Sequence, residues 1–225
     1  MTTLVVTSVL CPLGAWADEE RPHANLSADS SRAAANDLFK AQVYAEATDA
    51  NPGDVARRVN SQITGAIQAA RNYPTVKVRS NGSNTYPVYG KNGRTIEGWR
   101  MRSNLSLESS DATAVSELLG KLQQNLAIAS LLATPSPETW KKAEDEAITD
   151  ALTAFQNRAA LIAGSLKKKW KIRQVTVNTN GPSRPPMPYL RAQASMASAD
   201  TSPPALEAGD SQVSVQVNGQ IEFLE

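Results

Sequence analysis

Two carboxylates and two guanidinium groups are the side chains of this chain best placed to do chemistry. Glu46 and Glu108 fall on the polar faces of two expected strands, and Arg100 and Arg102 share the face of Glu108. Two carboxyls held at a fixed separation in a cleft could hydrolyse a glycosidic bond. The two arginines could bind an anion or pair with Glu46 or Glu108, and we favour ion pairs. These four residues are therefore the candidate anion-binding or ion-pair face.

Cysteine and histidine are almost absent from the chain. Cys11 is the only cysteine and His23 the only histidine, and both precede the region expected to fold. Without a thiolate or an imidazole there, Ser-His-Asp and Cys-His mechanisms are excluded, as are Cys-ligated zinc and iron–sulfur clusters. We therefore predict no catalytic residue, no metal site and no cofactor, and a protein that is not an enzyme.

Residues 1–17 have the pattern of a secretory signal peptide. A short apolar run precedes Ala15-Trp16-Ala17, which predicts cleavage between Ala17 and Asp18. The alternative is a membrane anchor, but a span needs about 20 apolar residues and this run is shorter. No Lys or Arg precedes the run, so a start further upstream is an alternative. We predict a periplasmic or envelope-associated protein with no transmembrane span in the mature chain.

The charge balance argues against a nucleic-acid partner. The chain has 23 Lys and Arg against 22 Asp and Glu, whereas an electrostatic grip on nucleic acid needs a basic face. The densest basic cluster, Lys167–Lys171, closes a long predicted helix, where cations complement the helix dipole. A helix terminus is the favoured interpretation. The alternative is that this cluster, with Arg100 and Arg102, binds anionic polymers of the envelope.

Apolar periodicity predicts the elements that position these residues. Leu38–Thr48 alternates apolar and polar residues, which is typical of a half-buried strand. Asn51, Asp111 and Ser136 each stand where an N-cap would begin a helix. The elements expected after the first strand are a helix from Pro52 to before Pro74, a hairpin over 76–89 and 96–108, a helix after Asp111, a strand over 127–132, a helix over 137–166, and strands over 170–177 and 211–224. The long helix is expected to bury the row Ile148, Leu152, Phe155, Ala159, Ile162 and Leu166.

Two details of the last strands follow from the period of two. The strand over 170–177 does not alternate cleanly, which indicates a bulge. Asn218-Gly219 is typical of a hairpin turn, but an unbroken strand places five apolar side chains on one face: Val213, Val215, Val217, Ile221 and Phe223. We therefore predict one long strand, with Gly219 at a bend or close approach.

These elements predict an α+β fold, with mainly antiparallel sheet or sheets and amphipathic helices packed on one side. The predicted order is β-α-β-β-α-β-α-β-β. Residues 18–36 are polar and rich in Ala and Ser, and we predict a flexible N-terminal arm there. Residues 37–225 are predicted to form a single domain, which contains a Pro/Ala/Ser-rich loop at 178–210.

The order of several segments resembles a known family. These segments are Lys40–Ala47, Arg57–Asn60, Ile96–Ser103, Ser136–Glu138 followed by Ala143–Ala147, and Gln212–Phe223. Together they cover most of 38–224, and they resemble the SIMPL-domain family of exported bacterial proteins. The resemblance implies an α+β domain in the periplasm or envelope, with no established catalytic residues and a tendency to self-associate.

The function predicted from these observations is non-enzymatic. We expect a homo-oligomer or a complex with an envelope protein, because long terminal strands are natural templates for pairing. The alternatives are a carboxylate-based hydrolase or carbohydrate-binding protein of the periplasm, and a binder of anionic envelope polymers.

Overall fold

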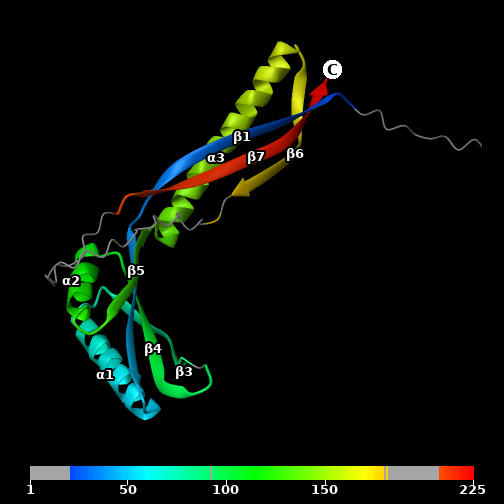
Figure 1. Cartoon of the computed structure of the whole chain (residues 1–225). Coiled ribbons are helices and arrows are strands. Elements are labelled where there is room, and N and C mark those ends of the chain that lie inside the picture. Colours follow the sequence, from blue (N-terminus) through cyan, green and yellow to red (C-terminus); the bar gives the residue numbers. More distant parts are fainter. Residues whose placement is uncertain (1–20, 92, 180, 182–207) are drawn as a thin grey trace, which may run out of the picture.

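The computed structural model describes residues 21–91, 93–179, 181 and 208–225. Within them the chain forms seven strands and three helices (Figure 1). In chain order these are β1 (His23–Ala35), β2 (Leu38–Asp49), α1 (Pro52–Ala70), β3 (Lys77–Tyr89), β4 (Ile96–Ser109), α2 (Ala112–Leu122), β5 (Ala127–Thr134), α3 (Pro137–Ser165), β6 (Lys169–Thr179) and β7 (Asp210–Leu224). The α+β class is confirmed, and from Leu38 onward so is the order of the elements.

The prediction of a flexible arm over 18–36 was wrong for residues 23–35, which form the additional strand β1. This strand pairs antiparallel with β7 along its whole length, from His23 opposite Glu222 to Ala35 opposite Asp210. Leu26, Ala28 and Ala34 are buried on one face of β1. The buried positions of β1 are mostly alanines, so the alternation of apolar and polar residues in this segment is a weak signal in the sequence. The strand depends on a partner almost two hundred residues away in the chain, and the folded part therefore begins before residue 37.

The first sheet has the order β1-β7-β6 and is covered on one face by α3 (Figure 1). The expected bulge in β6 is confirmed by a shift of register between Ile172 and Gln174. The expected single strand through Asn218-Gly219 is also confirmed. An added Cβ at Gly219 would lie 2.5 Å from the Gln174 carbonyl oxygen and 2.8 Å from Phe155 Cζ. Only glycine lets β7 pass this close to both β6 and α3.

The buried face of α3 differs from the one predicted. Phe155 and Ala159 are buried as expected, but Leu166 is 56% exposed, and Ile148, Leu152 and Ile162 lie only partly buried beside the core. The buried row consists mainly of alanines: Ala143, Ala147, Ala151, Ala159 and Ala163, with Phe155 among them. Small side chains let the helix lie close to the sheet, which displaces the larger aliphatic residues to its margins.

The second sheet has the order β3-β4-β2-β5, with α1 and α2 on one face. The core between them contains residues from both layers: Val43, Leu105 and Leu107 from the strands, and Val55, Val59, Leu118 and Leu119 from the helices. The β3–β4 hairpin closes where the Gly90 N–H donates to the Thr95 carbonyl at 2.9 Å. This sheet presents its other face, from β3, β4 and β2, to solvent.

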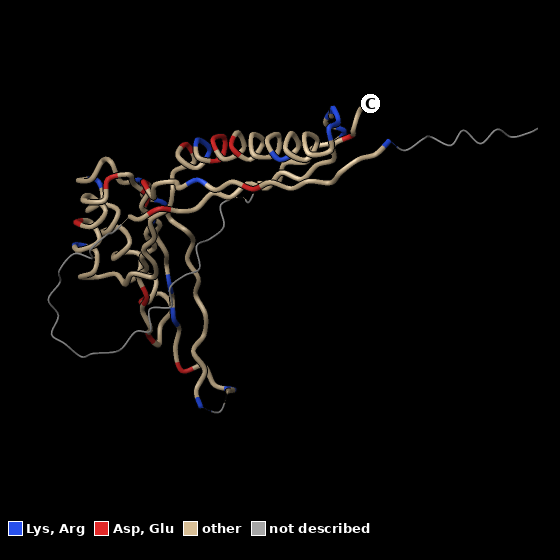
Figure 2. The backbone as a smooth tube through the Cα atoms, turned by 90° about the horizontal axis from the view of Figure 1, so that it is seen from above, with Lys and Arg blue, Asp and Glu red and all other residues tan. Residues whose placement is uncertain are grey.

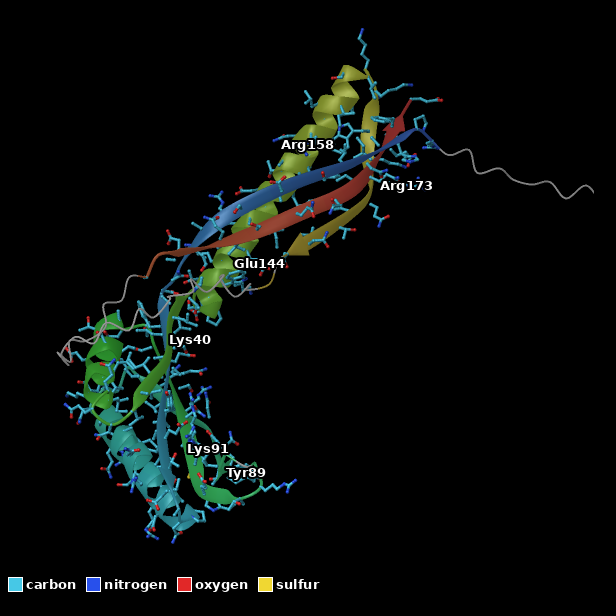
Figure 3. All side chains as sticks on the ribbon, viewed as in Figure 1. Lys40, Tyr89, Lys91, Glu144, Arg158 and Arg173 are labelled. Carbon is cyan, nitrogen blue, oxygen red and sulfur yellow. The ribbon has the colours of Figure 1, made fainter. Side chains whose placement is uncertain are left out.

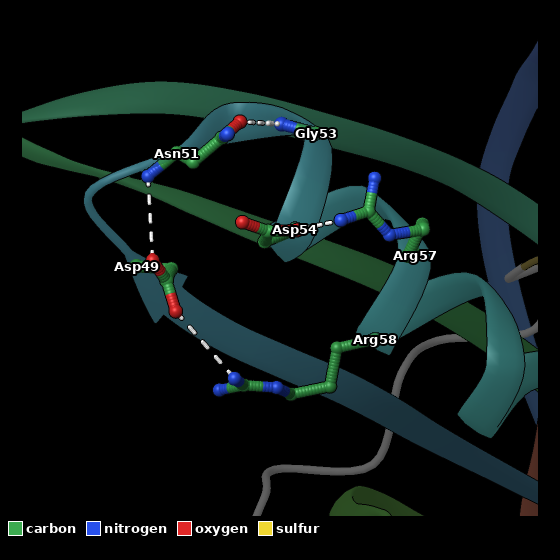
Figure 4. Close-up of polar contacts among 6 residues, drawn as sticks. All are labelled: Asp49, Asn51, Gly53, Asp54, Arg57 and Arg58. Carbon is green, nitrogen blue, oxygen red and sulfur yellow. Dashed lines mark hydrogen bonds and ion pairs between the residues drawn. The ribbon is translucent and has the colours of Figure 1, made fainter.

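The predicted helix caps are confirmed. The Asn51 side chain accepts from the Gly53 N–H at 2.8 Å, with Asp49 alongside it (Figure 4). Asp111 accepts from the Ala114 N–H at 3.0 Å, and Ser136 Oγ accepts from the Thr139 N–H at 3.2 Å. Each cap satisfies an N–H that a helix start leaves without a partner.

The two sheets extend away from a shared junction and have separate buried clusters (Figures 1 and 2). The chain crosses between them at Asn36–Asp37 and again at Pro135–Ser136. Asn36 ties the first crossing to the start of β7, because its Nδ2 donates to the Ala208 carbonyl at 2.7 Å and its Oδ1 accepts from Ser211 Oγ at 2.7 Å.

Several sequence predictions fall partly or wholly beyond the described residues. The signal peptide over 1–17, with its cleavage site between Ala17 and Asp18, lies outside them, as do residues 182–207 of the loop predicted over 178–210. At the ends of that loop, Asn178 belongs to β6 and Asp210 begins β7. Among the helices that the structure describes, none is both long enough and apolar enough to cross a membrane.

Candidate functional site

The candidate residues lie together on the solvent face of the four-stranded sheet. The antiparallel register of β2 and β4 places Glu46 opposite Arg102 and Lys40 opposite Glu108. Side chains directly opposite one another on one face lie within about 5 Å at Cβ. The register therefore sets opposite charges side by side at two separate points on this face.

The two arginines have different partners. Arg100 Nε lies 3.9 Å from Glu46 Oε1 and donates to Thr48 Oγ1 at 3.0 Å. The guanidinium carbon of Arg102 lies 3.5 Å from the centroid of the Tyr44 ring. Arg100 therefore forms a loose, exposed ion pair of the kind that contributes little stability, whereas Arg102 makes a cation–π contact.

Glu46 and Glu108 do not converge. Glu108 Oε2 lies 4.0 Å from Lys40 Nζ, and Lys40 and Glu46 are six positions apart on β2. At about 3.4 Å per residue, this places the two carboxylates about 20 Å apart along the strands. Glycosidases hold their two carboxyls about 5 to 9.5 Å apart. The proposed carboxylate pair is therefore not assembled.

Two cations that sequence reasoning did not select complete this face. Lys77 and Arg79 of β3 lie opposite Glu108 and Ser106 of β4. With Lys40, they line a hollow of about 130 Å³, whose other lining residues are Ala41, Gln42, Ser106, Leu107 and Glu108. The alternation of Lys77, Val78 and Arg79 was a signal for a polar face. The register that places that face beside Lys40 was not visible in the sequence.

The lysine cluster at 167–171 lies far from this face, on the other sheet, near the C-terminus (Figure 2). The Lys168 N–H donates to the Ala163 carbonyl and the Lys167 N–H to the Gly164 carbonyl, at 3.0 and 3.1 Å. This is the Schellman pattern that ends a helix, with Lys167 at a positive φ of 51°. The cluster is therefore a helix terminus, and it does not share an anion-binding surface with Arg100 and Arg102.

Beside this terminus, Glu222 of β7 binds two cations. Lys171 Nζ lies 3.3 Å from Glu222 Oε2, and Arg21 Nη1 lies 3.1 Å from Glu222 Oε1. Partial burial raises the pKa of Glu222, but the hydrogen bonds and charges of Lys171 and Arg21 outweigh it and hold that pKa below its ordinary value. The triad joins β6, β7 and the residues before β1, so its geometry fits a structural role.

The sequence matches one family model. It is described as SIMPL, protein of unknown function (DUF541), and it matches residues 24–221. Comparison with curated proteins found no match.

Similarity to solved structures is weak. AtUAH in complex with glyoxylate is 10% identical with a TM-score of 0.30, over 54% of this chain and 33% of its own. An amidase of the hydantoinase/carbamoylase family from Burkholderia multivorans is 10% identical with a TM-score of 0.24, over 48% and 28%. An unknown protein from Galdieria sulphuraria is 12% identical with a TM-score of 0.20, over 86% and 82%. The chain spans a third or less of the length of the first two, and none of these likenesses bears on activity.

Proposed function

This chain belongs to the SIMPL family, which is described as a family of unknown function, and we propose that it acts without catalysis. In this proposal it is a periplasmic or envelope-associated protein that assembles with itself, or with an envelope partner, through the free edges of its sheets. The export pattern of residues 1–17 supports the compartment. The observation that best supports assembly is the exposed edge of strand β6.

Sheet edges offer unpaired backbone groups, and proteins usually guard them with charge, proline or bulges. The edge strand β3 is guarded in all three ways. It contains Lys77, Arg79 and Pro87, and its register shifts between Ser80 and Ser83. Pairing with another chain is therefore disfavoured at β3.

The edge strand β6 is guarded along only half of its length. Its first half contains Lys169, Lys171 and Arg173 and ends at the bulge. Its second half, from Val175 to Thr179, has no charged residue, no proline and no bulge, and Val177 is 39% exposed. A β-branched, uncharged and exposed edge is a natural template for another strand. We take Val175–Thr179 as the pairing edge.

The test compares two substitutions on the same strand. In Val177→Lys a charge is placed in the unguarded half, whereas in Ile172→Lys it is placed at a similarly exposed aliphatic residue, 43% exposed, in the half that already has cations. Sedimentation of the purified protein over a wide concentration range should show an oligomer that Val177→Lys dissociates and Ile172→Lys leaves intact. A strictly monomeric protein from which crosslinking recovers no envelope partner would contradict the proposal, as would equal effects of the two variants.

The compartment has a separate test. The full chain expressed in a bacterial host should appear in the periplasmic extract with Asp18 as its first residue. Retention in the cytosol with residues 1–17 still attached would contradict export, whatever the oligomeric state.

A further inference from the structure

The hollow on the solvent face of the four-stranded sheet carries an inference that does not depend on assembly. We infer that it is a binding site for a phosphate-class oxyanion, held by Lys40, Lys77 and Arg79. The site lies at the junction end of the sheet. Lys40 marks that end in Figure 3, and Tyr89 and Lys91 mark the opposite end, at the hairpin tip.

The sheet register brings the three cations together. Lys77 and Lys40 lie on either side of Glu108, one on β3 and one on β2. Arg79 occupies the next outward position along β3, opposite Ser106. Neighbouring strands are about 4.8 Å apart, and outward positions on one strand are about 7 Å apart. The three flexible side chains can therefore reach one bound group from three directions.

The charge of the hollow is not balanced by the protein. Three cations and one carboxylate line it, which leaves a balance of +2 at neutral pH. Glu108 forms only a weak ion pair with Lys40, because Lys40 Nζ lies 4.0 Å from Glu108 Oε2. Within the described residues, neither Lys77 nor Arg79 forms an ion pair. When several cations line a concave site, their electrostatic field is concentrated inside that site, and it attracts an anion.

The size and donors of the hollow indicate the class of anion. Its volume of about 130 Å³ is below the range of roughly 300–1,000 Å³ typical of drug-sized ligands. It equals the volume of about four waters, which suits a small phosphate-class oxyanion such as phosphate or pyrophosphate. The Arg79 guanidinium offers forked N–H donors that match phosphate geometry. The Gln42 side chain, which also lines the hollow, adds a neutral amide donor.

The experiment is calorimetric titration with pyrophosphate at constant ionic strength. The double variant Lys77→Gln/Arg79→Gln should bind at least about tenfold more weakly than the wild type, because it removes two charge-assisted contacts. The variant Glu108→Gln should bind more tightly, because it removes the only carboxylate in the hollow. These two changes have opposite signs, so loss of folding cannot imitate the pattern.

The matched control is Lys141→Gln/Lys142→Gln, which removes the same charge from two exposed lysines of α3. It should leave pyrophosphate binding unchanged within about twofold, since neither lysine is among the residues that line the hollow. The inference is overturned if the wild type does not bind pyrophosphate, if the control loses as much affinity as the test variant, or if Glu108→Gln weakens binding. Binding to vesicles containing phosphatidylglycerol without binding to pyrophosphate would also overturn it, because a membrane surface would then be the ligand.

Discussion

Asp37 Oδ2 accepts a hydrogen bond from Thr139 Oγ1 at 2.6 Å, and this contact joins the two places where the chain crosses between its sheets. Ser136 Oγ also donates to Asp37 Oδ2, at 3.0 Å, and the Ser136 N–H donates to Asp37 Oδ1. The Asp37 carboxylate, at the first crossing, therefore binds the first turn of α3, at the second crossing. The relative position of the two sheets depends on this polar cluster as well as on the backbone.

We predict that Asp37→Asn lowers the free energy of unfolding at pH 7 by about 1 kcal/mol, a value reduced from that of a buried charged hydrogen bond because the carboxyl is partly exposed. Burial raises the pKa of Asp37, but the hydrogen bonds from Thr139 and Ser136 outweigh it and hold that pKa below the ordinary value of 3.8. The stabilisation is therefore complete above pH 3.8 and is lost as the pH falls through the lowered pKa of the folded state.

Denaturant titrations of Asp37→Asn between pH 2 and pH 7 would check this. The difference from the wild type should be constant at higher pH and should shrink at the acid end. Asp29→Asn is the control, since the Asp29 side chain is exposed and makes no hydrogen bond or ion pair within the described residues. A difference between Asp37→Asn and the wild type that persists unchanged at pH 2 would argue against this role of the carboxylate.

A second prediction concerns the close approach at Gly219. In Gly219→Ala the added methyl group would meet the Gln174 carbonyl and the Phe155 ring at under 3.0 Å. Relieving the overlap must move β6 or α3, and we expect a loss of about 2 kcal/mol in the free energy of unfolding. Gly65→Ala is the matched control, because Gly65 lies in α1 with no atom within 4 Å of an added Cβ. That variant should gain about 0.5 kcal/mol from helix propensity. Equal effects in chemical denaturation would show that β7 does not pass β6 this closely.

A third prediction concerns the end of α3. Lys167 occupies the left-handed position of the Schellman motif, where a side chain is strained and glycine is favoured. We expect Lys167→Gly to raise the free energy of unfolding by about 0.5 kcal/mol, since relief of strain outweighs the lost cation at the helix terminus. Thermal unfolding would measure it. Lys168→Gly removes the same charge from a neighbour without positive φ and should not stabilise. A stabilisation shared by both variants would point to charge as its cause.

Much of the local structure was predictable because its causes lie within a few residues of each other. Asn51, Asp111 and Ser136 cap the helices that follow them, since a cap needs only its own side chain and an N–H two or three residues away. The single strand through Gly219 followed from the period of two in β7. Asn218-Gly219 is typical of a hairpin turn, but the unbroken strand places more apolar side chains on one face, and this arrangement is the one that forms.

The sequence by itself determined the elements from Leu38 onward and the class of fold, but it wrongly placed His23, the only histidine, before the folded part, whereas His23 begins β1. The tertiary structure alone decided that residues 23–35 form β1, because only β7 supplies the hydrogen bonds that make an alanine-rich segment a strand. It also separated Glu46 from Glu108 and set Lys77 and Arg79 beside Lys40. Such placements depend on the register between strands distant in sequence, and no local pattern contains that register.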